Sequence, residues 1–244
     1  MTDYAVLEGR ISIEAALRAH SRDVYTIYIS QKKPHRGTAG LERLARSAGV
    51  AVERVDEAFI QSHSAGRTHG GVIAFVGERK VLQLQELLEE ASPPFVVMLD
   101  GVEDPFNFGY ALRSLCAAGV GGVVVRPRDW TSAAGIVARA SAGASELTPM
   151  ALAESALTAA AFFKAQGLTI ACTAKRDAVS IYDADLTVPL FVLLGGEKRG
   201  VTRSFLDKAD IVLGVPYSRK FGASLPTASA AAVIAFEVMR QRSK

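Results

Sequence analysis

The sequence predicts an α/β protein in which a parallel sheet, covered by helices on both faces, follows a smaller α/β unit. Two observations predict this fold class. Short apolar runs rich in β-branched residues recur from residue 94 onward, and segments of helical composition lie between them. Continuous apolar strands that alternate with helices are typical of a parallel sheet buried on both faces.

The C-terminal part supplies the parallel sheet. Predicted strands cover residues 95–99, 120–125, 168–172, 190–194 and 211–215. Predicted helices cover residues 110–118, 132–140, 155–166 and 202–208, and an Ala-rich helix covers residues 225–241. Ligands of such sheets bind at the carboxyl ends of the strands, so the loops after the strands are the candidate site.

The N-terminal part of the sequence is predicted to form the smaller unit. It contains a helix over residues 7–19, a strand over 25–29, a polar loop over 30–40, a helix over 41–48 and a strand over 72–76. Residues 82–90 have helical composition, and Ser92-Pro93-Pro94 makes a stiff junction. The predicted organisation is a smaller α/β domain over residues 1–80, a linker over 81–93 and a parallel-sheet domain over 94–244.

Composition limits the class of protein. With 244 residues, 49% of them hydrophobic and 22% charged, the chain can bury a large core. It has no run of eighteen apolar residues and no signal-peptide pattern, so we expect no membrane span and a cytoplasmic location. Cys116 and Cys172 lie in apolar contexts, which indicates buried thiols. The four histidines have no Cys or acidic cluster beside them, so no metal is expected. The basic N-terminal third suits a polyanion-binding arm, but charge alone favours an ordinary fluctuation.

Several common motifs are missing. Residues 195–200 read GGEKRG, but Val201 stands where a phosphate-binding loop needs Lys. No G-x-G-x-x-G follows a strand, and no G-x-S-x-G occurs. These absences argue against a P-loop enzyme, a dinucleotide-binding domain and an α/β-hydrolase.

Three strand-end loops carry the candidate chemistry. Residues 100–113, DGVEDPFNFGYALR, place Asn107 and Arg113 after one strand, and residues 193–200, LLGGEKRG, place two glycines and Glu197 after another. Residues 215–225, VPYSRKFGASL, mix cations with aromatics, as nucleic-acid contacts do, and Ser224 is positioned to cap the last helix. Taken singly, each loop is also compatible with an ordinary turn or helix start.

Together the loops resemble the three motifs of the SpoU (TrmH-like) branch of the SPOUT RNA 2′-O-ribose methyltransferases. The similar segments are DPFNFGYALRS at 104–114, LGGEKRG at 194–200, and the V-P, S-L and F-E pairs between Val215 and Glu237. Residues 138–149, ARASAGASELTP, resemble the middle segment of the family. Residues 7–17 and 69–72 resemble the start and the end of its substrate-binding domain.

The resemblance implies that residues 94–244 form a SPOUT methyltransferase domain with a deep trefoil knot and that residues 1–80 form a small α/β (L30e-like) RNA substrate-binding domain. It also implies a homodimer. It implies transfer of a methyl group from S-adenosylmethionine to a ribose 2′-hydroxyl of RNA, with ribosomal RNA favoured over tRNA by analogy. The implied catalytic residues are Asn107, Arg113, Glu197 and Ser224. The implied cofactor-binding residues are Leu194, Gly195, Gly196, Val215 and Leu225.

The implied role of Arg113 is open between assisting deprotonation and positioning a phosphate, because an arginine side chain does not normally lose its proton. Asn107 and Ser224 are expected to orient the ribose, and Glu197 to hold Arg113 or the substrate.

The third motif departs from the family pattern. The usual Ser-Leu-Asn-Val-Ser is here Ser224-Leu225-Pro226-Thr227-Ala228, and the preceding loop is one residue longer, with Arg219 where Gly is usual. Pro cannot supply the hydrogen bonds of Asn, so that polar contact is either missing or supplied by another residue, with Thr227 and Ser229 as the candidates. The departure motivates one alternative, a catalytically impaired RNA-binding module with a methyltransferase fold. A second alternative is an unrelated α/β enzyme that acts on a nucleotide or small metabolite.

Overall fold

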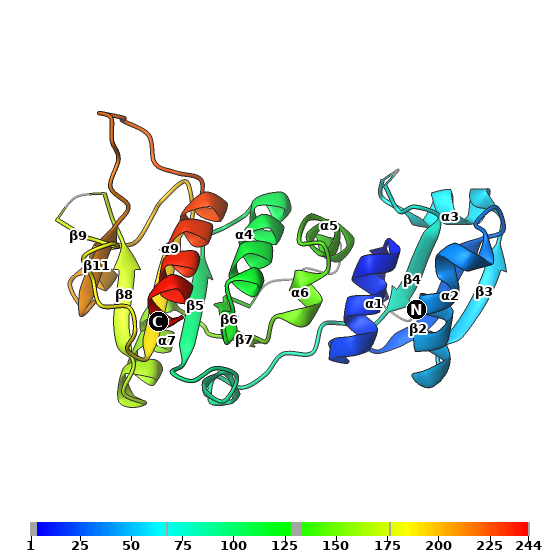
Figure 1. The fold of residues 1–244 in the computed structure, drawn as a ribbon, viewed down its shortest axis with the longest axis horizontal. Helices are drawn as coiled ribbons and strands as arrows, with labels where there is room; N and C mark the ends of the chain where they lie inside the picture. Colours follow the sequence, from blue (N-terminus) through cyan, green and yellow to red (C-terminus); the bar gives the residue numbers. More distant parts are fainter. Residues whose placement is uncertain (1–3, 67, 128–132, 176, 244) are drawn as a thin grey trace. The chain divides into compact units, whose positions relative to one another are not determined.

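The computed structural model describes residues 4–66, 68–127, 133–175 and 177–243 (Figure 1). The chain forms two compact units. The N-terminal unit contains the chain up to Lys80 together with helices α5 (Ala134–Ala140) and α6 (Ala144–Leu147), and the C-terminal unit contains the rest. Residues 134–147, which were predicted as part of the C-terminal domain, thus pack with the N-terminal unit.

The N-terminal unit is built on a four-stranded sheet with the order β1-β4-β2-β3. Its strands are β1 (Ala5–Glu8), β2 (Val24–Ser30), β3 (Ala51–Val55) and β4 (Val72–Val76). Its other helices are α1 (Arg10–Ala19), α2 (His35–Ser47) and α3 (Glu57–His63). Only β2 and β3 pair in parallel. The core includes Leu7, Ile13, Ile27 and Ile29, and Ala134 and Ala138 of α5 belong to it.

Two predictions for this unit are corrected. The helix predicted from residue 7 begins at Arg10, because residues 5–8 pair with β4 and Gly9 has a φ of +85°, which interrupts the chain direction. The loop predicted over residues 30–40 ends at Pro34. The proline ring fixes an extended backbone at the N-cap, and α2 begins at His35.

Helices α5 and α6 are held on the N-terminal unit by buried ion pairs. Arg22 Nε donates to Glu146 Oε2 at 3.0 Å, and Ser21 Oγ donates to the same oxygen at 2.6 Å. Arg139 pairs with Glu8, whose side chain is also buried. A Cβ at position 135 would lie 2.7 Å from the Val6 carbonyl oxygen, so Gly135 allows α5 to approach β1 closely.

The C-terminal unit is a seven-stranded sheet in which every neighbouring pair is parallel, with the order β7-β6-β5-β10-β8-β11-β9. The strands are β5 (Phe95–Asp100), β6 (Gly122–Val125), β7 (Met150–Leu152), β8 (Thr169–Thr173), β9 (Val179–Ser180), β10 (Leu190–Gly195) and β11 (Ile211–Gly214). The helices are α4 (Pro105–Ala117), α7 (Ala156–Ala165), α8 (Arg203–Leu206) and α9 (Thr227–Arg242).

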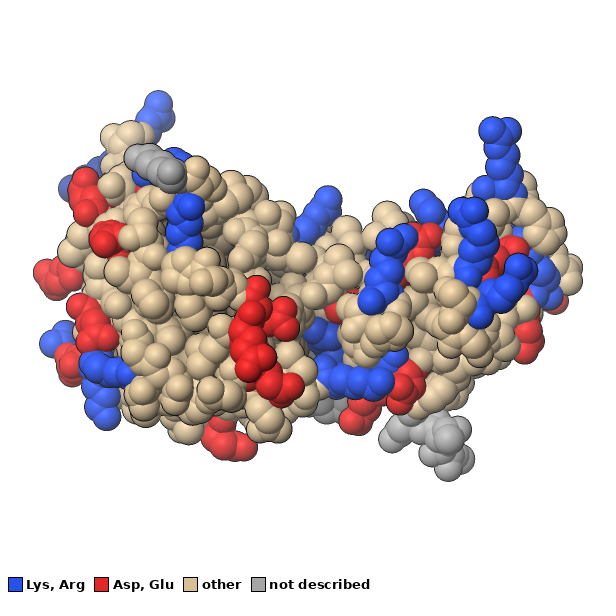
Figure 2. Space-filling model, turned by 60° about the horizontal axis from the view of Figure 1, so that its bottom comes forward, with Lys and Arg blue, Asp and Glu red and all other residues tan. Residues whose placement is uncertain are grey.

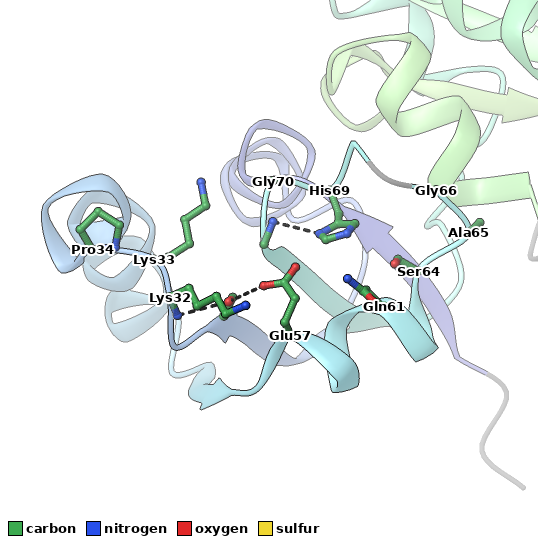
Figure 3. A pocket seen from close by; sticks show the side chains of 12 residues that line it. Lys32, Lys33, Pro34, Glu57, Gln61, Ser64, Ala65, Gly66, His69 and Gly70 are labelled. Atoms are coloured by element: carbon green, nitrogen blue, oxygen red, sulfur yellow. Dashed lines mark hydrogen bonds between the residues drawn. The ribbon is translucent and has the colours of Figure 1, made fainter.

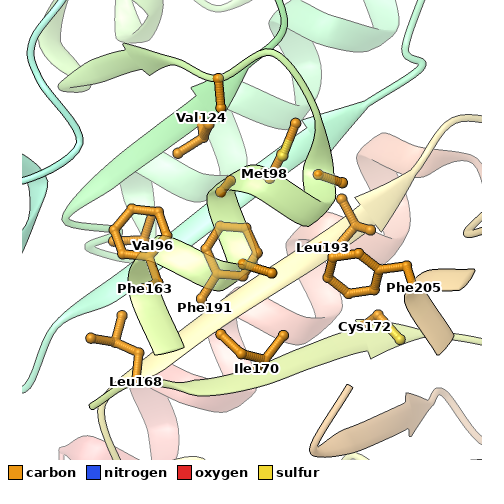
Figure 4. Close-up of a cluster of buried hydrophobic side chains, with 14 of the residues drawn as sticks. Val96, Met98, Val124, Phe163, Leu168, Ile170, Cys172, Phe191, Leu193 and Phe205 are labelled. Carbon is orange, nitrogen blue, oxygen red and sulfur yellow. The ribbon is translucent and has the colours of Figure 1, made fainter. Parts of the chain in front are cut away.

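Helices cover both faces of this sheet, as predicted. Helices α4 and α9 pack side by side on one face (Figure 1). On the other face, Phe163 of α7 stacks on Phe191 of β10 with ring centroids 4.9 Å apart, and Phe205 of α8 joins the same cluster (Figure 4). Cys172 is buried in this cluster, whereas Cys116 is half-buried, and both thiols are free.

The five predicted strands of the C-terminal part are confirmed, but several helices differ. The helix predicted from residue 110 begins at Pro105, because Asp104 caps it and accepts from Phe106 N at 3.0 Å. The helix predicted over 132–140 is α5, and Ser132 lies outside the described residues. The predicted helix over 82–90 is wrong: only the 3₁₀ turn η1 (Glu86–Leu88) forms, because Leu82 N donates to Met150 O and extends the chain along β7. Over the described residues, no helix is both long and apolar enough to cross a bilayer.

Candidate functional site

The first two candidate loops meet at the carboxyl ends of β5 and β10. These strands are parallel neighbours with Asp100 opposite Gly195, so the loops that follow them leave the sheet side by side. Asn107 lies in the first turn of α4, and its Nδ2 donates to Glu197 Oε1 at 2.8 Å. The structure therefore joins two of the predicted catalytic residues by a direct hydrogen bond.

The two glycines after β10 allow a close approach between backbone segments of the protein itself. Gly196 N donates to Asp100 O at 2.6 Å, and a Cβ at position 196 would lie only 2.0 Å from Gly101 O. A Cβ at position 195 would lie 2.4 Å from the Gly200 carbonyl carbon. The sequence predicted a close approach to a ligand here, but the turn and the adjacent loop already require both glycines.

The third loop is joined to the second through Thr227. Helix α9 begins at this residue, and Thr227 Oγ1 donates to Gly195 O at 3.1 Å. The prediction that Ser224 caps the last helix is wrong, because Pro226 occupies the N-cap and Ser224 lies exposed two residues before it. Thr227 thus supplies a polar contact in the motif where Pro226 replaces the usual Asn.

The same loop folds back on itself. Leu225 N donates to Tyr217 Oη at 3.0 Å, and the rings of Tyr217 and Phe221 lie 6.2 Å apart. Lys175, just after β8, donates to the carbonyl oxygens of Phe221 and Gly222 and lies over the Tyr217 ring at 5.8 Å. Sequence reasoning missed Lys175, because a single lysine after a strand is not a distinctive signal.

Ion pairs between described residues engage several of the charged groups at this edge, but Arg113 is not one of the paired groups. Arg126, after β6, binds Asp100 through Nε at 2.6 Å and Nη2 at 2.9 Å, and this hydrogen bonding raises the pKa of its guanidinium. Lys198 pairs with Glu103 at 2.5 Å on the surface. Arg113 is exposed on α4, and no hydrogen bond or ion pair joins it to any residue that the structure describes. Glu197 therefore holds Asn107 here, and Arg113 remains available for a ligand.

The residues expected to hold S-adenosylmethionine fit its chemistry. Gly195 and Gly196 follow β10, Val215 follows β11, and Leu225 lies next to the Thr227 contact, so their main-chain groups collect at one edge of the sheet. Half-buried Val215 and Leu225 offer apolar surface for an adenine ring. The Leu194 side chain is 2% exposed, so this residue can contribute only its main chain.

The parallel α/β domain with its converging strand-end loops, together with the separate small α/β unit, has the organisation of an S-adenosylmethionine-dependent RNA methyltransferase. Residues 94–236 match the SpoU rRNA methylase family, and residues 6–82 match the family described as RNA 2′-O ribose methyltransferase substrate binding. The chain belongs to the SpoU rRNA methylase family, which confirms the resemblance in the sequence.

Relatives match the chain over nearly its whole length. It is 30% identical over 246 residues to the protein of Pseudomonas putida named 23S rRNA (guanosine-2′-O-)-methyltransferase RlmB, covering 99% of this chain and 98% of that one. It is 28% identical over 240 residues to the protein of the same name from Shewanella oneidensis, covering 97% of each. Its fold is similar to that of the SpoU methyltransferase AviRb from Streptomyces viridochromogenes, crystallised with AdoMet, with a TM-score of 0.81, 21% identity and coverage of 99% and 91%.

The sequence predicts no metal site, and the structure shows how the potential metal ligands are arranged. Among the residues that the structure describes, no three His, Cys, Asp or Glu side chains gather in a way that could hold a metal ion. His69 is buried and accepts a hydrogen bond from Gly71 N, and His63 packs on Phe59 with ring centroids 4.3 Å apart. These contacts orient the two side chains within the N-terminal unit.

Proposed function

We propose that this protein transfers a methyl group from S-adenosylmethionine to the 2′-hydroxyl of a guanosine in 23S ribosomal RNA. The observation that carries the proposal is the joining of the three motif loops by the Asn107–Glu197 and Thr227–Gly195 hydrogen bonds. The full-length match to proteins named for this reaction supports the target.

The roles of the site residues follow from their contacts. The bound cofactor supplies an electrophilic methyl group, and the attacking ribose hydroxyl is a weak nucleophile that has to be held in line with it. Asn107, oriented by Glu197, would hold the ribose through its remaining donor and acceptor, and the exposed Ser224 hydroxyl would bind a neighbouring oxygen. The Arg113 guanidinium is exposed and makes no hydrogen bond or ion pair with the described residues, which favours binding of an RNA phosphate over a role as base.

The cofactor would be held by the main chain of Leu194, Gly195, Gly196, Val215 and Leu225. These residues lie on both sides of the Thr227–Gly195 contact, so this hydrogen bond fixes the two halves of the cofactor site relative to each other. The trefoil knot implied by the resemblance remains a prediction for the chain path through these loops.

A homodimer is part of this proposal. Helices α4 and α9 pack together and carry exposed apolar side chains, Phe106 and Tyr110 on α4 and Phe236 and Met239 on α9. Exposed apolar surface on paired helices is typical of a protein interface. Light scattering at micromolar concentration would show a dimer, and Phe236→Glu would convert it to a monomer. A ribosomal RNA target also supports the predicted cytoplasmic location.

The alternative of an RNA-binding module without turnover is motivated by Pro226 and Ala228. The direct test is incorporation of labelled methyl groups from S-adenosylmethionine into 23S rRNA purified from cells that lack this protein, followed by mapping of the methylated ribose. Transfer by the wild-type protein and loss in Arg113→Ala would support the enzyme. Tight RNA binding with no incorporation into 23S rRNA or any other RNA would support the binding module.

A further inference from the structure

A cavity of about 880 Å³ opens on the N-terminal unit, outside the methyltransferase loops. It lies between the β2–α2 loop, helix α3 and the loop before β4, and is lined by Ser30, Lys32, Lys33, Glu57, Gln61 and His69, among others (Figure 3). Its volume lies within the range of roughly 300–1,000 Å³ that is typical of sites for small ligands. None of its polar side chains has a role in the methyl-transfer site.

One side of the cavity presents two unpaired ammonium groups. No hydrogen bond or ion pair joins Lys32 Nζ or Lys33 Nζ to any residue in the described ranges. The Lys33 stem packs over Gly71, where a Cβ would lie 3.2 Å from Lys33 Cγ, and Gly71 has a φ of +72°. Arg54 Nη1 holds the Lys33 carbonyl oxygen at 2.6 Å. The loop thus positions a free cation in advance, which suits a phosphate group.

The other side of the cavity presents one hydrogen-bond acceptor, on Glu57, and one hydrogen-bond donor, on His69. Ser30 Oγ donates to Glu57 Oε2 at 2.8 Å, which leaves Oε1 as an acceptor toward the hollow (Figure 3). Gly71 N donates to His69 Nδ1 at 2.9 Å, so the imidazole carries its proton on Nε2 and can act as a donor. The His69 side chain is otherwise buried, which fixes its orientation.

This pairing matches the edge of one base. Guanine presents two adjacent N–H donors, N1 and N2, beside the O6 acceptor, whereas adenine presents an acceptor at N1. A carboxylate recognises the donors, and a ring N–H or the Gln61 amide recognises O6. Proteins read RNA sequence mainly at unpaired nucleotides whose base edges are accessible. Lys and Arg side chains project from several places on the face of this unit drawn at the right of Figure 2, as a phosphate backbone requires.

We propose that this cavity binds one unpaired guanosine nucleotide of the RNA substrate, with the base on Glu57 and His69 and its phosphate on Lys32 and Lys33. The proposal rests on the proposed function only in taking the nucleotide to be part of a substrate RNA. The cavity thus reads one base of the RNA, separately from the nucleotide that is methylated.

The test uses the full-length protein and fluorescein-labelled single-stranded hexanucleotides that differ only in a central guanosine or adenosine, with binding measured by fluorescence anisotropy. The wild-type protein should prefer the guanosine oligomer by about fivefold or more. In Glu57→Gln the amide oxygen can still accept from Ser30, so an NH₂ group faces the cavity and the preference should disappear. Unchanged thermal unfolding of this variant shows that the fold is intact.

Lysine variants test the phosphate side. Lys33→Ala should weaken binding of both oligomers equally and flatten the dependence of log Kd on log salt concentration. Arg43→Ala, which removes an exposed cation of α2 outside the cavity, is the matched control and should change neither. Equal binding of the two oligomers by the wild-type protein, or a guanosine preference that survives Glu57→Gln, would overturn the proposal.

Methyl transfer to 23S rRNA, measured on the same preparations, separates this proposal from the proposed function. Methylation by a protein that shows no guanosine preference would contradict guanosine binding in the cavity and support the proposed methyltransferase activity. A guanosine preference that depends on Glu57, in a protein that methylates no RNA, would support guanosine binding and contradict the methyltransferase activity.

Discussion

Arg22 and Glu146, 124 positions apart in the sequence, form an ion pair at 3.0 Å in which both side chains are more than nine-tenths buried. The pair attaches α6 to the end of the small sheet, and Ser21 donates a second hydrogen bond to the same carboxylate. Removing one partner of such a pair leaves an uncompensated charge in a low-dielectric surrounding, which is more costly than losing the pair as a whole.

Glu146→Ala should therefore destabilise the N-terminal unit by about 3–5 kcal/mol. Urea unfolding followed by circular dichroism measures the change. Glu154→Ala removes an exposed carboxylate from the C-terminal unit and should stay within about 0.5 kcal/mol of wild type. Equal midpoints for the two variants would contradict a structural role for the Arg22–Glu146 pair.

The Thr227 hydroxyl is expected to support cofactor binding. Thr227→Val keeps the shape of the side chain but removes the donor to Gly195 O. Since one hydrogen bond contributes about 0.5–1.5 kcal/mol, the KM for S-adenosylmethionine should rise about 2- to 12-fold. Thr227→Ser restores the hydroxyl and should recover most of the affinity. A wild-type KM in the valine variant would show that the link between the second and third loops is dispensable.

Asn107 and Glu197 should act as a pair. Asn107→Ala removes the side chain proposed to orient the ribose, and kcat should fall about 100-fold, as when a pre-positioned donor is lost. Glu197→Gln should produce a similar loss, and the double variant should lose little more than either single one because the two changes break one interaction. Glu103→Gln, in an exposed ion pair with Lys198, serves as the control and should retain activity. Fully additive losses in the double variant would mean that the two residues work independently.

The Cys172 thiol should make the free energy of unfolding depend on pH in the alkaline range. Burial raises the pKa of its thiol from the ordinary 9.0 to about 11. The folded state therefore keeps the proton where the unfolded state releases it, so this contribution to stability is present below pH 9.0 and is lost as the pH rises to about 11. The free energy of unfolding, measured from pH 8 to 11, should fall more steeply in the wild-type protein than in Cys172→Ala. Parallel profiles of the free energy of unfolding against pH for the two proteins would show that burial does not raise the pKa of this thiol.

Five of the seven strands of the large sheet could be predicted because each is a continuous apolar run, and residues such as Phe191 are fully buried in the structure. The edge strands β7 and β9 were not predicted, because three and two residues are too few to form such a run. The strand β3 could not, because AVERV has no apolar run and its residues are exposed or half-buried at the sheet edge. The prediction that a helix begins at residue 7 failed for a related reason. Residues 5–8 continue an apolar helical pattern, but they pair with β4, and this tertiary pairing overrides the local preference.

The meeting of the candidate loops was predictable, since parallel neighbouring strands bring their following loops together. The choice of partner for Glu197 was not. It depends on where α4 begins, and the Asp104 cap places Asn107 in the first turn and Arg113 further along the helix. The glycine pattern was also ambiguous. Gly195 and Gly196 indicate that something approaches the backbone closely, but the sequence does not tell whether this is a bound ligand or, as in the structure, the backbone of Gly101 and Gly200.

The location of α5 and α6 has a consequence for how the protein is made. The ribosome releases the small sheet first, but the two helices that complete its core and neutralise Glu8 and Arg22 come after β5, α4 and β6. At translation rates of about 5–20 residues per second, the interval between Lys80 and Leu147 lasts about 3–13 s. During that time the nascent chain exposes an apolar face and unpaired charges. We therefore expect chaperones that bind polypeptides during synthesis to bind this part of the chain.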